Sequence, residues 1–303
     1  MTTAPSKPNP TSRRELTRVS PSLGVCPEFH NALMELGLTS LETVFAFEPG
    51  RDLVKANIGR FRRRLQFEAT PIGSKRPVRV FLKRYDAPPI LRQLGNWLLH
   101  HRKVSFASAE REAADQLAAA GVNTPRVVAC GERWGILFEQ RSFLMVEEIE
   151  DSQSLERKLP ACFAEPATPE TLRARRSFIR RLASFIERFH KTGYRHRDLY
   201  LPHIFHSEAG EFCLIDLARA SRPILRRRFQ IKDLAQLHYS APAGRFSRTD
   251  RVRFFLDYVG RRRLLPRDKL FLRAILRKAG RMARHNVKHG AVPPFLERKA
   301  DGR

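Results

Sequence analysis

The stretch that most constrains this chain runs from residue 194 to residue 219, where two aspartates flank a short apolar run. Asp198 closes a His-Arg-Asp tripeptide, and Asp216 lies eighteen residues later at the end of the apolar run. An amphipathic segment that begins at Thr168 with a capping threonine and a proline, and ends at Gly193, precedes the tripeptide. The order of elements is therefore a long helix, a polar loop and a strand, with a carboxylate on the loop and another at the strand end.

This layout is typical of kinases, in which a catalytic loop is followed by a strand that delivers a metal-binding aspartate. Asp198 is expected to be the catalytic base that accepts or orients the proton of an attacking hydroxyl. Asp216 is expected to bind Mg²⁺ on the phosphates of ATP, because hard cations prefer carboxylate oxygens.

A lysine upstream fits the nucleotide side of such a reaction. Lys83 lies near the end of a strand-like run, where a kinase keeps the lysine that contacts the α- and β-phosphates of ATP. Its partner should come from the following helical segment, 105–121, in which Glu110 and Glu112 compete. Glu110 is preferred, because helical spacing places it on the same face as Leu117.

The end of the first half of the chain is a predicted hinge. The backbone groups from Glu147 to Ile149 are expected to pair with the adenine of ATP. A proline-containing polar connection follows, and beyond Ser221 the pattern indicates helices separated by basic loops.

The periodicities indicate an α+β protein with a two-lobed, protein-kinase-like fold, in which the N-lobe is β-rich and the C-lobe mainly helical. Runs 61–67 and 78–85 alternate as an antiparallel hairpin, and further strands are predicted at 127–130, 135–139 and 142–146. The predicted domains are a disordered leader (1–22), an N-terminal extension with the β-rich nucleotide lobe (23–147), and a helical catalytic lobe with a basic C-terminal region (148–303).

The charge of the chain narrows its partners to polyanions. The formal net charge is +26, and residues 222–303 hold 23 lysines and arginines against 6 aspartates and glutamates. This region is either a solvated basic surface or a surface for an anionic membrane. A phosphate backbone would also fit, but no aromatic-studded motif favours a specific nucleic acid.

The cysteines and the hydropathy pattern bear on the compartment. The four cysteines have no short paired spacing, so neither a zinc site nor a disulfide framework is indicated, and a reducing cytoplasm fits best. No run approaches the ~20 apolar residues that cross a bilayer.

Three segments carry a resemblance to a known family. They are His196-Arg-Asp-Leu-Tyr-Leu-Pro-His-Ile-Phe205, Leu214-Ile-Asp-Leu-Ala-Arg219 and Lys232-Asp-Leu-Ala-Gln-Leu-His-Tyr-Ser240. Together they resemble the bacterial lipopolysaccharide core kinases, which phosphorylate Kdo or heptose of the inner core. The chain departs from protein kinases at Tyr200, at His203 and at Leu217-Ala218, where those enzymes have lysine, asparagine and Phe-Gly.

The resemblance implies a kinase-like fold, ATP and Mg²⁺ as cofactors, and a core glycolipid as the acceptor. It makes His203 the second metal or phosphate contact, in place of the asparagine. It also implies a cytoplasmic protein that binds peripherally to the anionic inner face of the cytoplasmic membrane. The phosphate-covering loop is degenerate, since Gly59 is the glycine that remains before the arginines.

Two other functions use the same residues. One is an atypical protein or small-molecule kinase, and the other is a pseudokinase that its basic region tethers to an anionic surface. Lys83, Asp198 and Asp216 together favour a catalyst over the pseudokinase. The sequence makes no prediction of an oligomeric state.

Overall fold

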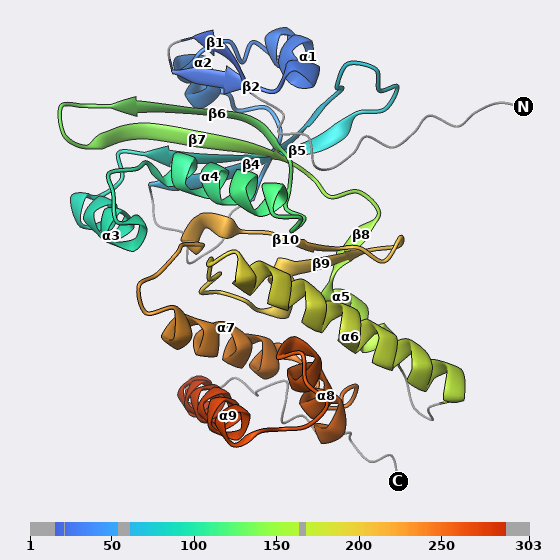
Figure 1. The fold of residues 1–303 in the computed structure, drawn as a ribbon. Helices are drawn as coiled ribbons and strands as arrows, with labels where there is room; N and C mark the ends of the chain where they lie inside the picture. The colour runs from blue at the N-terminus through green and yellow to red at the C-terminus, as the bar shows by residue number, and fades with distance from the viewer. Residues whose placement is uncertain (1–15, 21, 54–60, 164–167, 289–303) are drawn as a thin grey trace, which may run out of the picture. The chain divides into compact units, whose positions relative to one another are not determined.

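The structure is a computed structural model that describes residues 16–20, 22–53, 61–163 and 168–288. The chain divides into two compact units, Met1–Ile149 and Glu150–Arg303. Figure 1 shows the sheet of the first unit and the helices of the second. The division falls after Ile149, the last residue of the predicted hinge.

The first unit is built on a seven-stranded antiparallel sheet, with strand order β1-β2-β6-β7-β5-β4-β3. Its strands are β1 (Thr17–Ser20), β2 (Leu23–Val25), β3 (Arg51–Asp52), β4 (Arg62–Ala69), β5 (Val78–Asp86), β6 (Val127–Trp134) and β7 (Glu139–Glu147). Its helices are α1 (His30–Glu35), α2 (Leu41–Ala46), α3 (Ile90–His100) and α4 (Phe106–Ala119).

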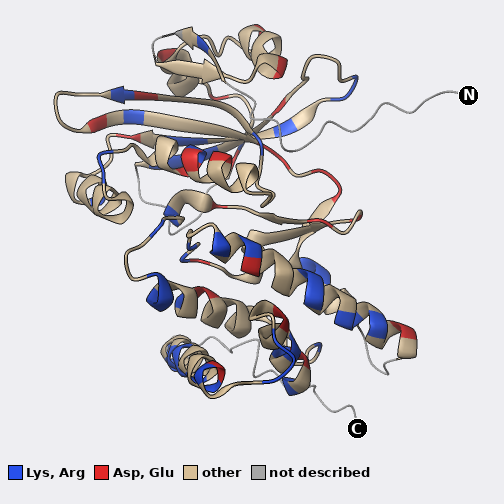
Figure 2. Cartoon of the chain, in the orientation of Figure 1, with Lys and Arg blue, Asp and Glu red and all other residues tan. Residues whose placement is uncertain are grey.

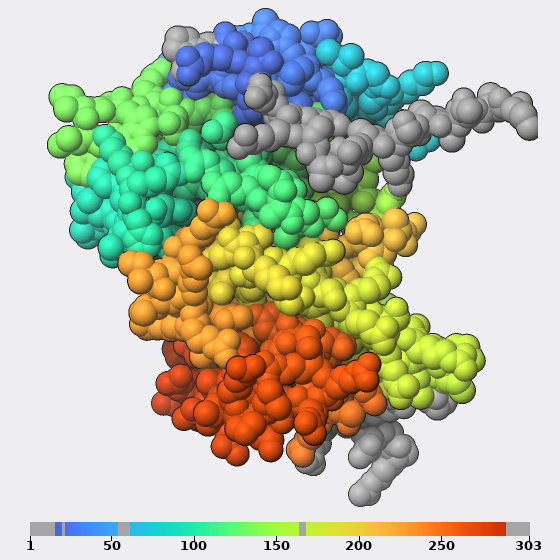
Figure 3. Space-filling model, in the orientation of Figure 1, coloured from blue at the N-terminus to red at the C-terminus, as the bar shows by residue number. Residues whose placement is uncertain are grey.

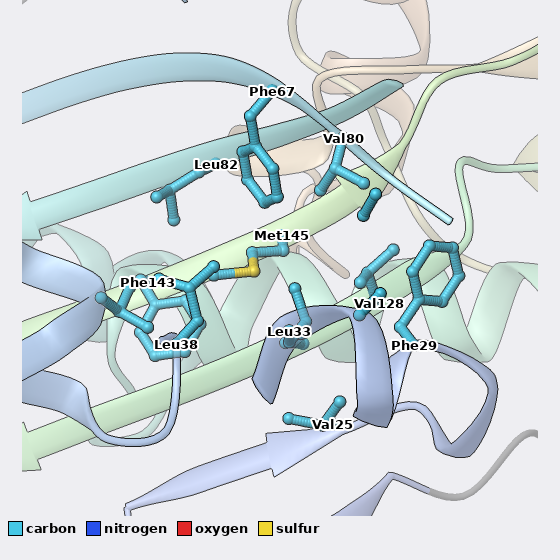
Figure 4. Close-up of a cluster of buried hydrophobic side chains, with 14 of the residues drawn as sticks. Val25, Phe29, Leu33, Leu38, Phe67, Val80, Leu82, Val128, Phe143 and Met145 are labelled. Atoms are coloured by element: carbon cyan, nitrogen blue, oxygen red, sulfur yellow. The ribbon is translucent and has the colours of Figure 1, made fainter. Parts of the chain in front are cut away.

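Alternation along the strands separates the core from the surface of this sheet. In β5 the side chains of Val80 and Leu82 are fully buried, and the residues opposite them on β4 are Phe67 and Leu65. Figure 4 shows Phe67, Val80 and Leu82 in one hydrophobic cluster with residues of α1, β6 and β7, and Leu65 belongs to the same cluster. The predicted hairpin is therefore confirmed, and its register places Lys83 opposite Arg64.

Three predictions about this unit were wrong or incomplete. Residues 17–20, assigned to the leader, form β1 because their backbone pairs with β2. Residues 135–138, assigned to a strand, form the turn of the β6–β7 hairpin, where the Gly135 amide donates to the Phe138 carbonyl at 2.8 Å. Helix α3 was not predicted, because its buried face is polar. Residues 1–15 of the leader and Gly59 lie outside the described residues.

The second unit has a small antiparallel sheet, β10-β9-β8, and a set of helices. The strands are β8 (Ser152–Ser154), β9 (Ile204–Ser207) and β10 (Phe212–Leu214). The helices are α5 (Leu155–Lys158), α6 (Pro169–Lys191), α7 (Arg226–Ser240), α8 (Arg248–Tyr258) and α9 (Pro266–Val287). Helix α6 packs on α8, and α7 packs on α9.

Helix α6 forms as its sequence dictates. Thr168 accepts a hydrogen bond from the Thr171 amide, Pro169 occupies the first turn, and Phe185, Ile186 and Phe189 are almost completely buried.

The predicted fold class is confirmed, with an antiparallel sheet in the N-terminal unit and a mainly helical C-terminal unit. Figure 2 shows lysines and arginines along α6 to α9. Among the described residues, no helix is long and apolar enough to span a membrane.

Candidate active site

In the first unit, Lys83 and Glu110 form a buried ion pair. The Lys83 Nζ and a Glu110 carboxylate oxygen are 2.5 Å apart, and the two side chains are 12% and 5% exposed. The hydroxyl of Tyr85 lies 3.5 Å from the other carboxylate oxygen of Glu110. Glu112, the competing candidate, pairs with Arg102 instead. The preference for Glu110 from helical spacing therefore agrees with the observed pair, while the role of the pair in nucleotide binding stays a prediction.

The N-terminus of α4, the helix that carries Glu110, is held by two carboxylates from the sheet. Glu139 on β7 accepts a hydrogen bond from the Phe106 amide at 3.1 Å and another from the Ser142 hydroxyl at 2.5 Å. Glu132 on β6 accepts hydrogen bonds from the hydroxyls of Ser105 and Ser108. The bond from Phe106 satisfies an orphan backbone donor of the first turn, and the bonds from Ser105 and Ser108 tie the same turn to β6, so α4 and its glutamate are fixed against the sheet.

Burial affects these carboxyls differently. Desolvation raises the pKa of Glu139 to about 7, although its hydrogen bonds from Ser142 and Phe106 oppose the shift. The pKa of Glu132 is lowered, because hydrogen bonds from Ser105, Ser108 and Trp134 outweigh the opposing desolvation. Glu139 is thus a carboxyl group of this unit whose charge changes near neutral pH.

The predicted hinge residues end β7. The Glu147 amide donates to the Arg126 carbonyl at 2.9 Å, and the Glu147 carboxylate lies 3.6 Å from the Arg126 guanidinium. Ile149 is the last residue of the first unit. Their contact with adenine stays a prediction.

In the second unit, a buried aspartate anchors the His-Arg-Asp loop. Asp233 on α7 is fully buried and accepts the backbone amides of His196 at 2.8 Å and Arg197 at 2.7 Å. Its carboxylate also accepts a hydrogen bond from His190 Nε2 at 3.3 Å. Arg197 has a φ of 68°, in the left-handed region that costs a non-glycine residue roughly 1–2 kcal/mol. Asp233 therefore stabilises a loop conformation that the backbone alone disfavours.

Further side chains of α7 bind the same loop. Gln236 accepts the Leu199 amide and donates to the Arg197 carbonyl, both at 3.0 Å. Lys232 also donates to the Arg197 carbonyl. Because these residues and Asp233 lie within one and a half turns of a helix, α7 fixes the loop from one side.

The histidine of the tripeptide connects the loop to the strand end that carries Asp216. His196 is fully buried, and its Nε2 donates to the Ile215 carbonyl at 2.9 Å. Burial lowers the pKa of His196, so the ring is neutral near pH 7 and can hold one defined tautomer. The backbone of His196 is bound by α7 and its side chain by residue 215. The loop that carries Asp198 and the strand end that carries Asp216 are therefore held by the same histidine.

The carboxylate of Asp198 faces two cations. Both of its oxygens accept hydrogen bonds from Arg219 Nη1, at 2.9 and 3.1 Å, and Lys232 Nζ lies 3.8 Å away. Desolvation lowers the pKa of Lys232, and the neighbouring charge of Asp198 opposes that shift. Arg219 follows Asp216 by three residues, in a short 3-10 turn. The positive side chains orient the carboxylate.

His203 and Asp216 lie together in a way that suits a shared cation. His203 Nδ1 is 2.7 Å from the Asp198 carbonyl, which can only accept, so Nδ1 carries the proton. Nε2 faces the Asp216 carboxylate, 3.9 Å from its nearest oxygen. Metal-ligating histidines commonly donate their other ring nitrogen to a backbone carbonyl in this manner.

The described residues hold no cluster of three or more histidine, cysteine or acidic side chains that could bind a metal unaided. Asp216 and His203 would supply two ligands, and a Mg²⁺ site usually takes one or two protein carboxylates and completes its shell with substrate phosphates and water. The pair therefore fits a cation that arrives with a nucleotide.

The structure thus brings the predicted residues together in two groups: Lys83 with Glu110 in the first unit, and Asp198, His203 and Asp216 in the second. Three residues around Asp198 were given no role from the sequence, namely Arg219, Lys232 and Asp233. All three lie in the segments that carry the family resemblance, and that position is the signal that could have found them.

Comparison with known proteins gives consistent matches. The model of the lipopolysaccharide kinase (Kdo/WaaP) family matches residues 62–258. The chain is 32% identical to the lipopolysaccharide core heptose(I) kinase WaaP of Pseudomonas aeruginosa over 64% of the chain and 75% of that protein. It is 28% identical to the Escherichia coli K12 protein of the same name, over 76% and 87%. A solved structure of WaaP in complex with acyl carrier protein superposes with a TM-score of 0.62 at 26% identity, covering 82% of this chain and 95% of that one.

Proposed function

Because the chain belongs to the lipopolysaccharide kinase (Kdo/WaaP) family, we propose that it transfers the γ-phosphoryl group of ATP to a heptose hydroxyl of the lipopolysaccharide inner core. The observation that carries the proposal is the family match, which includes both aspartates of the 194–219 stretch. Heptose is preferred over Kdo because the similar curated proteins are heptose(I) kinases.

Asp198 is the base of the proposed reaction. Its carboxylate accepts the proton of the heptose hydroxyl while the oxygen forms a bond to the γ-phosphorus, and the bond to the β,γ-bridging oxygen breaks to release ADP. The hydrogen bonds from Arg219 hold the carboxylate in one orientation. Lys232, 3.8 Å from the same carboxylate, adds positive charge beside the transferring group.

Asp216 and His203 would hold Mg²⁺ through a carboxylate oxygen and Nε2. When bound, the ion would neutralise charge on the phosphates. Imidazole is a poorer Mg²⁺ ligand than oxygen, so Asp216 carries more of the affinity.

Lys83 binds the α- and β-phosphates of ATP, and Glu110 orients it. The support is the buried ion pair of the two residues. Glu110 compensates the charge of Lys83, which would be costly to bury without a partner. The first unit is accordingly the nucleotide lobe, with Glu147 to Ile149 as its adenine-binding hinge, and the second is the catalytic lobe.

A lipopolysaccharide acceptor would be phosphorylated at the cytoplasmic face of the inner membrane, and the protein's net charge of +26 favours its binding to that anionic surface.

A further partner is acyl carrier protein, with which the solved relative forms a complex. In support, the second unit has an apolar cavity suited to an acyl group. Its lining includes Phe178, Leu182, Leu234, Leu237, Phe255 and Ile275.

The test uses purified protein, labelled ATP and Mg²⁺, with heptose-terminated truncated lipopolysaccharide as one acceptor and a protein extract as the other. Label should appear in the glycolipid alone. Label in the extract alone would indicate a protein kinase. If neither acceptor is labelled and millimolar ATP with Mg²⁺ leaves the melting temperature unchanged, the chain is a pseudokinase.

A further inference from the structure

Helix α3 has its polar face inside and its apolar face outside. The buried residues of this helix are Gln93 and Asn96, at 1% and 5% exposure. On the opposite side four aliphatic residues are exposed by 45–83%: Ile90, Leu91, Leu94 and Leu98. Their spacing of one, three and four residues places them on one stripe. This is the reverse of the pattern of an ordinary surface helix.

Hydrogen bonds fix this orientation. The Gln93 amide donates to the carbonyls of Pro88 and Glu139, at 2.8 and 3.0 Å, and accepts the Glu139 amide at 2.7 Å. Asn96 donates to the Val104 carbonyl at 3.0 Å. Rotating α3 to bury its leucines would break all four bonds and leave buried polar groups without partners. The hydrogen bonds of Gln93 and Asn96 therefore keep the leucines of α3 exposed.

The turn between β6 and β7 extends the apolar surface. Trp97 of α3 stacks on Phe138 of this turn, with ring centroids 5.6 Å apart and planes 7° from parallel. The same turn exposes Ile136 by 98% and Leu137 by 63%. We call the six exposed aliphatic residues of α3 and this turn the α3 patch. Figure 3 shows the teal segment that contains α3 at the surface of the first unit.

The surroundings of the α3 patch are basic. No acidic residue occurs between Asp86 and Glu110, whereas this interval holds Arg92, Lys103 and Arg102, of which Arg102 is paired with Glu112. Asp86 is paired with Arg141, so its charge is compensated. Lys103 Nζ lies 4.7 Å from the ring centroid of Trp134. An aliphatic stripe with neighbouring tryptophans and cations is the composition of a helix that lies in a membrane interface.

We propose that the α3 patch docks on an anionic lipid bilayer, inserting its aliphatic side chains at the boundary of head groups and acyl chains while the cations bind lipid phosphates. Charge complementarity selects this occupant over a second copy of the chain, whose surface has the same strongly positive sign. The proposal rests on the proposed function in one respect: a glycolipid acceptor gives the docking its purpose.

The test is co-sedimentation of the full chain with vesicles of phosphatidylglycerol and phosphatidylethanolamine, against vesicles of phosphatidylcholine. The variant is Leu91→Gln/Leu98→Gln, at positions 83% and 77% exposed. Its matched control is Met34→Gln/Ile72→Gln, which removes exposed apolar side chains elsewhere in the first unit. We expect the first variant to bind the anionic vesicles about 10- to 100-fold more weakly than wild type. The control should bind like wild type, and Arg92→Glu should weaken binding further at low salt.

Equal binding by wild type and Leu91→Gln/Leu98→Gln would overturn the proposal. So would a wild-type dimer in analytical ultracentrifugation that this variant abolishes, because the patch would then join two copies. A water-soluble core oligosaccharide as acceptor separates the two proposals. Wild type and Leu91→Gln/Leu98→Gln should phosphorylate this soluble acceptor equally. If neither protein phosphorylates it while vesicle binding still depends on the leucines, the proposed function fails and the docking surface stands.

Discussion

Asp233→Asn removes the buried charge that anchors the catalytic loop while keeping the shape of the side chain. The wild-type carboxylate accepts the amides of His196 and Arg197 at 2.8 and 2.7 Å. In the variant one oxygen becomes an NH₂ group, so one of these buried amides faces a donor.

The magnitude follows from these bonds. A hydrogen bond to a charged group contributes about 1.5–3 kcal/mol, and a buried donor left without an acceptor costs about 1–3 kcal/mol. The asparagine oxygen retains one weaker bond, so the net loss is about 3 kcal/mol. This is a large fraction of the ~5–15 kcal/mol that stabilises a typical domain. Arg197, at a φ of 68°, also loses the contact that holds it in a left-handed conformation.

Hydrogen exchange of the His196 and Arg197 amides reports the loop directly, and urea unfolding reports the second unit as a whole. In the variant both amides should lose protection, kcat should fall, and the KM for ATP should stay near the wild-type value because Lys83 is untouched. Glu170→Gln is the control, since its carboxylate is 74% exposed and paired only on the helix surface. Unchanged amide protection with kcat within twofold of wild type would refute the anchoring role of Asp233.

Three other substitutions test separate parts of the site. Lys83→Met should raise the Kd for ATP at least about tenfold by removing the phosphate contact; isothermal titration with ATP measures this, and unchanged affinity would exclude the contact. Glu139 has a pKa raised from 4.5 to about 7, so it is neutral in the folded state at a pH where the unfolded chain is already ionised. Its stabilising contribution is complete below pH ~4.5 and is lost as the pH rises through ~7, by at most about 3 kcal/mol. Glu139→Gln should flatten this slope in urea titrations across that range, and an unchanged slope would assign it to another group. His203→Ala should raise the Mg²⁺ concentration needed for half-maximal activity, whereas His203→Asn should restore it in part; equal Mg²⁺ dependence in all three proteins would remove His203 from the metal site.

Short-range patterns predicted much of the site because its parts are local. Helical spacing was enough to prefer Glu110 over Glu112, since the two residues point to different sides of α4 and only Glu110 meets Lys83. Alternation was likewise enough for the β4–β5 hairpin, whose strands each bury one face.

Long-range and inverted patterns were not predictable in this way. The bonds of Asp233 span 36 and 37 residues, and the periodicity of α7 alone does not distinguish it from a surface aspartate. Helix α3 was missed because a buried polar face contradicts the rule that helices turn apolar residues inward. Gly135 was placed in a strand because the apolar residues that follow it, exposed in a turn, look like a buried run.

The most direct test compares wild type with Asp198→Asn in phosphoryl transfer from labelled ATP to heptose-terminated lipopolysaccharide. The chain should label the glycolipid, and Asp198→Asn should lower kcat about 10²- to 10⁴-fold, the usual contribution of a general base, with ATP binding retained. Transfer by Asp198→Asn at the wild-type rate would contradict the assignment of the catalytic base.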